Sequence, residues 1–247
     1  TTLGPGERWL IQPKELDETG RLWSPGVREG VKPGSEYHMT EYFGPILGIM
    51  TADTLEEAIE LQNAPDYGLT AGLHSLDADD LELWLSKVQA GNVYVNRGIT
   101  GAIVRRQPFG GWKKSTVGSG TKAGGPNYLV ALTDWEPDHA TATTVPQSVA
   151  VREVLATAEG ASLCGAKDFE FIKRSASSDA HAWETEFGYG HDPSKLGVER
   201  NILRYLPTQV LVRADESAPA AEVVRVVLAG LAAGAPIALS TARDLPV

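Results

Sequence analysis

The stretch GNVYVNRGITGAIVRRQPFGG, residues Gly91–Gly111, decides how this chain is interpreted. It begins with Val93-Tyr94-Val95, β-branched and aromatic residues that are typical of a strand. A long connection rich in glycine follows, and glycines suit a backbone that takes φ > 0 or passes close to another group. Apolar residues such as Ile103 and Phe109 within it argue against a disordered loop. A long ordered loop of this kind is usually functional.

Composition alone leaves two interpretations of this loop open. One is a surface loop with a few buried anchors. The other is a ligand loop in which glycine amides hydrogen-bond an anionic group while Phe109 packs on the ligand's carbon chain. Backbone amides in such a nest bind an anion without any charged side chain.

A resemblance to a known family favours the ligand loop. Residues 91–111, followed by KAGGPNYL at Lys122–Leu129, resemble the substrate-anchoring loop of the glutamate-semialdehyde (1-pyrroline-5-carboxylate) dehydrogenases of the aldehyde dehydrogenase superfamily. Upstream, in the expected order, Glu41-Tyr42-Phe43-Gly44-Pro45 is similar to the superfamily's E-x-F-G-P motif. The resemblance covers residues 1–135 well and the remainder more loosely.

The resemblance implies an enzyme of proline catabolism that oxidises L-glutamate 5-semialdehyde to L-glutamate with NAD. By this analogy the amides around Gly101 and Ala102 bind the α-carboxylate of the substrate, and Phe109 packs on its methylenes. Arg105 stands where the family often has a small residue, so its side chain either faces solvent or pairs with the substrate carboxylate.

The resemblance also assigns two cofactor-binding residues. The glutamate that matches Glu41 hydrogen-bonds the nicotinamide ribose hydroxyls, and the phenylalanine that matches Phe43 packs near the nicotinamide. An ionised carboxylate suits two vicinal hydroxyls because it offers two acceptor oxygens. A second glycine-rich segment, Gly118–Ala123, is rejected as a dinucleotide fingerprint because no strand precedes it and Gly-Gly-Pro follows it.

Composition narrows the possible partners. The chain has 247 residues, a formal net charge of −10 and a pI of about 5.0, which disfavour nucleic acid and anionic membranes as partners. No apolar run approaches the ~20 residues of a membrane helix, and the acidic balance is ordinary for a cytoplasmic protein. The five histidines are scattered and Cys164 is the single cysteine, so we expect no metal site and no internal disulfide.

The order of elements predicts an α/β fold with parallel pairing. We expect residues 1–135 to be the distal part of an aldehyde dehydrogenase catalytic domain, 136–148 a linker, and 149–247 a helical segment with a partial Rossmann-like unit. That last unit resembles the degenerate C-terminal domain of some proline utilisation A proteins, and its first β–α turn lacks the glycine fingerprint. Strands are expected at 46–50, 67–73, 93–95, 128–135, 209–213 and 236–239. Helices are expected at 55–63, from 77 or 79 to 88, at 149–158, at 162–173 with 176–187 as its continuation, and at 218–233.

No catalytic residue is assigned within the chain. Aldehyde oxidation with a nicotinamide cofactor needs an activated cysteine, which in the superfamily precedes the E-x-F-G-P motif. No cysteine precedes Glu41, and Cys164 is expected to be a small apolar helix residue. The chain is therefore interpreted as the C-terminal part of a larger enzyme, inactive without its upstream half. The alternative is a non-catalytic aldehyde-dehydrogenase-like scaffold or oligomerisation module. By analogy, the strand expected at 128–135 belongs to an oligomerisation flap and implies a homodimer.

Overall fold

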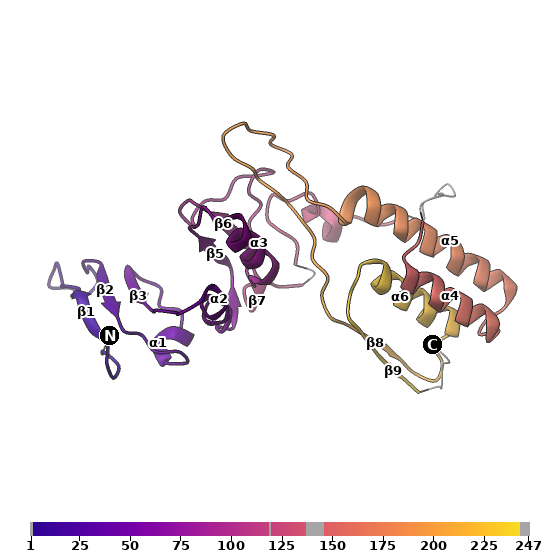
Figure 1. The fold of residues 1–247 in the computed structure, drawn as a ribbon, viewed down its shortest axis with the longest axis horizontal. Helices are drawn as coiled ribbons and strands as arrows, with labels where there is room; N and C mark the ends of the chain where they lie inside the picture. Colours follow the sequence, from indigo (N-terminus) through magenta and orange to yellow (C-terminus); the bar gives the residue numbers. More distant parts are fainter. Residues whose placement is uncertain (1, 119, 137–145, 243–247) are drawn as a thin grey trace. The chain divides into compact units, whose positions relative to one another are not determined.

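The computed structural model describes residues 2–118, 120–136 and 146–242, which divide into two units, Thr1–Thr133 and Asp134–Val247 (Figure 1). Most of the expected linker at 136–148 lies outside the described residues. Both units mix helices with parallel strand pairs, so the fold class is α/β, as the sequence predicts. No helix in the described ranges has the length and apolar character needed to span a membrane.

The first unit opens with a three-stranded sheet, β1 (Arg8–Ile11), β2 (Gly26–Glu29) and β3 (Ile46–Ile49). β1 runs antiparallel to β2, and β2 runs parallel to β3. A short helix, α1 (Glu36–Met39), lies between the last two strands. Arg28 of β2 is 1% exposed, and its guanidinium lies over the rings of Trp9 and Tyr37 while pairing with the Glu7 carboxylate at 2.7 Å.

The core of the first unit lies between two helices and a parallel strand pair. Helix α2 (Leu55–Asn63) begins where predicted, because the Thr54 hydroxyl accepts from the Glu57 amide. Helix α3 (Ala78–Lys87) begins at the Asp77 cap. Strands β5 (Thr70–Leu73) and β6 (Asn92–Val95) pair in parallel. The buried residues of this core are Ile59, Ala71, Trp84, Val88 and Ala90.

One predicted strand of this unit is interrupted, and another is wrong. The strand expected at 67–73 is divided into β4 (Tyr67–Gly68), which pairs with β7 (Trp112–Lys113), and β5, which pairs with β6. The strand expected at 128–135 is a 3₁₀-helix over Tyr128–Leu132. The homodimer was predicted from a flap strand at these residues, so it stays a prediction without that support.

The second unit is a three-helix packing joined to a β–α–β unit (Figure 1). Helices α4 (Val149–Gly160) and α5 (Ala166–Ala182) are followed by a π-helical turn, Trp183–Phe187. Strand β8 (Val210–Ala214), helix α6 (Ala220–Ala232) and strand β9 (Ile237–Thr241) complete the unit, and the two strands are parallel. Residues of all three helices form its core: Val151, Leu155, Ala158, Phe169, Ile172, Ala176, Val224 and Leu228.

Candidate functional site

The base of the loop 96–110 is fixed by two side chains that meet at one glycine. Asn92, at the start of β6, accepts from the Gly110 amide at 3.0 Å and donates to the Pro108 carbonyl at 2.9 Å. The Lys122 ammonium donates to the carbonyls of Gly91 at 2.6 Å and Gly110 at 2.7 Å. We call Asn92 and Lys122, with the backbone groups they bind, the loop clasp. The C-terminal end of the loop is thereby held against the start of the core strand β6.

The side chain of Tyr94 holds the middle of the loop. Tyr94 is 5% exposed and its hydroxyl donates to the Gly101 carbonyl at 2.7 Å. Gly101 has φ of 122°, a conformation that a side chain would strain. Gly101 and Ala102 are both exposed, and within the described part of the chain their amides donate to no protein acceptor. These two predicted site residues therefore present two free N–H groups on a restrained backbone.

The far part of the loop is a tight turn. The Ile103 carbonyl accepts from the amides of Arg106 and Gln107. Arg105 occupies the left-handed region at φ of 64°, is exposed, and donates its amide to the Gly124 carbonyl at 2.9 Å. Phe109 is half-buried and exchanges backbone hydrogen bonds of 3.0 and 2.8 Å with Ala123. The segment KAGG at 122–125, quoted with the loop for its resemblance, is thus its structural partner.

The two predicted cofactor residues line one concavity of about 330 Å³ in the first unit. Glu41 is exposed and Phe43 is fully exposed, so the carboxylate and the ring are both available to a ligand. Met39, Thr40 and Tyr67 complete the lining. Tyr67 was not singled out from the sequence, because it stands well beyond Phe43 along the chain and no motif links the two.

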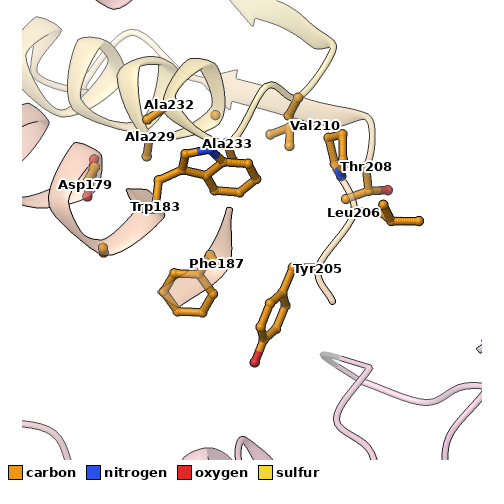
Figure 2. Close-up of a pocket in the computed structure, with 14 residues that line it drawn as sticks. Asp179, Trp183, Phe187, Tyr205, Leu206, Thr208, Val210, Ala229, Ala232 and Ala233 are labelled. Carbon is orange, nitrogen blue, oxygen red and sulfur yellow. The ribbon is translucent and has the colours of Figure 1, made fainter. Parts of the chain in front are cut away.

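A separate pocket of about 360 Å³ lies in the second unit (Figure 2). Figure 2 shows the Trp183 ring beside Ala229, Ala232 and Ala233, while the rings of Phe187 and Tyr205 lie next to each other on another side of the pocket. The Asp179 carboxylate at its edge is engaged by both terminal nitrogens of Arg225, at 2.6 and 2.9 Å. The walls are therefore mainly apolar, and the pocket contains none of the predicted site residues.

The turn between β8 and α6 is closed by an acidic side chain. Asp215 accepts from the Ser217 amide at 2.8 Å and the Ala218 amide at 3.1 Å. In a dinucleotide fold, backbone amides of this turn bind the pyrophosphate. Here a carboxylate already occupies two of them, which agrees with the missing glycine fingerprint.

Cys164 lies in the connection between α4 and α5, where the sequence predicted a helix. It packs against the core of the second unit, and burial, with a smaller contribution from Asp168, raises the pKa of its thiol. A raised pKa is the opposite of what an activated nucleophile requires. Among the described residues, no group of His, Cys, Asp and Glu side chains has the arrangement of a metal site.

Residues 5–136, more than half of the chain, match the model of the aldehyde dehydrogenase family. The chain belongs to this family. A similar solved structure is proline utilization A from Corynebacterium freiburgense, which is 46% identical with a TM-score of 0.84 over 99% of this chain and 24% of that one. The 1-pyrroline-5-carboxylate dehydrogenase of Geobacillus sp. (strain WCH70) is 40% identical over 52% of this chain and 25% of its own length. A Thermus 1-pyrroline-5-carboxylate dehydrogenase solved with bound NAD is 39% identical over 47% of this chain and 22% of that one, with a TM-score of 0.44.

The chain thus spans about a quarter of the length of the aldehyde dehydrogenases that it matches. The family and the α/β fold agree with the prediction from the two motifs. The roles of Glu41, Phe43, Gly101, Ala102 and Phe109 remain predictions.

Proposed function

We propose that this chain is the substrate-anchoring part of a cytoplasmic, NAD-dependent dehydrogenase that oxidises L-glutamate 5-semialdehyde to L-glutamate. The observation that supports the substrate is the pair of exposed amides at Gly101 and Ala102, which have no protein acceptor in the described chain. Two neighbouring N–H donors suit a carboxylate. The half-buried ring of Phe109, on the same restrained loop, suits the methylenes of the semialdehyde.

The exposed Glu41 carboxylate and Phe43 ring fit the nicotinamide end of NAD. Both side chains line one concavity, which supports a site that would take a ribose diol and a flat ring together. Bound NAD would supply the hydride acceptor. Glu41 would accept hydrogen bonds from the ribose hydroxyls and fix the position of the ring, and it is not proposed as a general base.

We further propose that the nucleophilic cysteine is supplied by a preceding part of the same polypeptide. Three facts support this: the chain spans about a quarter of its relatives' length, no cysteine precedes Glu41, and the pKa of the Cys164 thiol is raised. The 247 residues alone are therefore expected to lack dehydrogenase activity.

A charge placed beside the two amides tests the proposed function. In the full-length polypeptide that carries this chain, Ala102→Glu should repel the substrate carboxylate, whereas Ala102→Gln has nearly the same size without the charge. Ala102 is exposed, so both side chains fit. We expect Ala102→Glu to raise KM for glutamate semialdehyde at least about tenfold relative to Ala102→Gln, as for one unscreened like-charge contact near a protein surface.

Propanal, which has no carboxylate, should be oxidised equally by both variants. Equal KM values of the two variants for the semialdehyde would refute the anchor. A full-length polypeptide that forms no NADH with either aldehyde would instead support the scaffold alternative.

A further inference from the structure

We propose that Lys122 is a positioning residue of the substrate anchor, holding the loop base so that the Gly101 and Ala102 amides and the Phe109 ring have one fixed arrangement. This inference rests on the proposed function. Lys122 opens the segment KAGGPNYL that was quoted for its resemblance, but the sequence assigns no role to its side chain, because its partners Gly91 and Gly110 lie elsewhere along the chain.

The first argument is the number of acceptors around one ammonium group. Lys122 Nζ lies 2.6 Å from the Gly91 carbonyl oxygen, 2.7 Å from the Gly110 carbonyl oxygen and 3.4 Å from Asn92 Oδ1. A protonated lysine has three donors and no acceptor, which matches three oxygens. Two of the acceptors lie at the start of β6 and the third, Gly110, ends the loop, so the ammonium cross-links the loop's C-terminal end to the start of the strand.

The second argument is enclosure. Burial lowers the pKa of Lys122 to about 8, so the ammonium has given up much of its water and depends on the protein oxygens around it. The group is still mostly protonated at neutral pH, because the pKa lies above 7. A surface lysine of the same unit, Lys114, is exposed and pairs with Asp66 instead.

The third argument is continuity with the anchor residues. Gly110, which Lys122 binds through its carbonyl, follows Phe109 directly, and Ala123, which follows Lys122 directly, exchanges backbone hydrogen bonds with Phe109. One side-chain contact and two backbone bonds thus join the same two short segments. Loss of the ammonium would leave Gly110 held by Asn92 alone and would loosen the restraint on the adjacent Phe109.

The test uses three variants of the full-length polypeptide: Lys122→Met, which keeps the length but removes the donors, Lys122→Arg, which keeps cationic donors, and Lys114→Met as a matched surface control. Lys122→Met should raise KM for glutamate semialdehyde about tenfold, the effect expected for one charge-assisted hydrogen bond, with kcat for propanal unchanged. Lys122→Arg should recover most of this loss, and Lys114→Met should match the wild type.

Hydrogen exchange of the peptide over residues 105–111 gives a readout that does not depend on activity. We expect faster exchange in Lys122→Met than in the wild type or in Lys114→Met. Unchanged exchange, or an equal loss on both aldehydes, would overturn the inference. A wild-type polypeptide that does not oxidise the semialdehyde would refute the proposed function, and the exchange data would then decide on the clasp alone.

Discussion

Replacing Gly91 by alanine tests whether the loop base must lie as close to β6 as the structure places it. A Cβ atom at Gly91 would stand 1.9 Å from the Gly110 carbonyl oxygen and 2.7 Å from Gly111 Cα. Both neighbours are backbone atoms, so no flexible side chain can move out of the way. Ordinary van der Waals contact begins at 3.4 Å, and the Gly110 carbonyl must therefore shift by more than an ångström.

A displacement of this size is large for an anchor that depends on fixed amides. A misplacement of about 1 Å in a binding element can lower turnover about a hundredfold. We expect Gly91→Ala in the full-length polypeptide to lower kcat/KM for glutamate semialdehyde by about that factor, and to affect propanal much less because propanal has no carboxylate to anchor. Faster hydrogen exchange over residues 105–111 should accompany the loss.

The matched control is Gly98→Ala in the same loop. A Cβ atom at Gly98 would meet no atom within 4 Å, and its φ lies outside the left-handed region. This variant should keep wild-type kinetics. The reasoning is refuted if the two variants behave alike, or if Gly91→Ala shows unchanged exchange over the loop.

Two further predictions concern stability. Glu7→Gln leaves the buried Arg28, which is 1% exposed, without its carboxylate partner, and should lower the free energy of unfolding of the first unit by about 3–5 kcal/mol. The control is Glu29→Gln, which removes the more exposed pair with Arg8 and should lower the free energy of unfolding by at most about 1 kcal/mol. Chemical denaturation measures both changes. The Gly4 amide, and to a smaller extent Arg28, lowers the pKa of Glu7. The contribution of the Glu7 carboxylate to the free energy of unfolding is therefore complete above the ordinary pKa of 4.5 and is lost as the pH falls through the lowered pKa. A Glu7→Gln variant whose stability fell with acid as steeply as that of the wild type would contradict this. In the second unit, Ile172→Ala truncates a fully buried side chain and should lower the free energy of unfolding by about 2–5 kcal/mol. Val226 is half-exposed, so Val226→Ala should lower it by at most about 0.5 kcal/mol. Equal unfolding midpoints for the two variants would show that the helices do not share one core.

The sequence predicted elements well where the determining interactions are local. Thr54 and Asp77 cap α2 and α3 through contacts within the first turn of each helix, and the apolar spacing of the helices identifies the faces they bury. The β–α–β unit at 210–241 follows from the same alternation of patterns. These signals are contained in short windows and do not depend on the rest of the fold.

The strand predictions failed where the local structure depends on hydrogen bonds to residues far along the chain. Residues 128–132 have strand-type side chains, but a strand needs a neighbouring ladder; here Tyr128 and Val130 donate instead to the nearby carbonyls of Gly125 and Asn127. The division of the strand at 67–73 has the same origin, because β4 pairs with β7, which lies far along the chain. The loop clasp could not be predicted either, since its contacts join positions that no short window of sequence contains.

The candidate anchor is made of backbone groups, and this explains which of its features are visible in the sequence. Amide donors leave no trace in side-chain identity, so the N–H groups of Gly101 and Ala102 were assigned only by resemblance. The glycines indicate the backbone conformation of the loop indirectly, because Gly91 has no room for a Cβ atom and Gly101 has φ of 122°. We therefore expect the loop to tolerate changes of exposed side chains better than the addition of one methyl group at Gly91. The specificity that we propose therefore depends more on the close approach of Gly91 to Gly110 than on the charge of any exposed arginine in the loop.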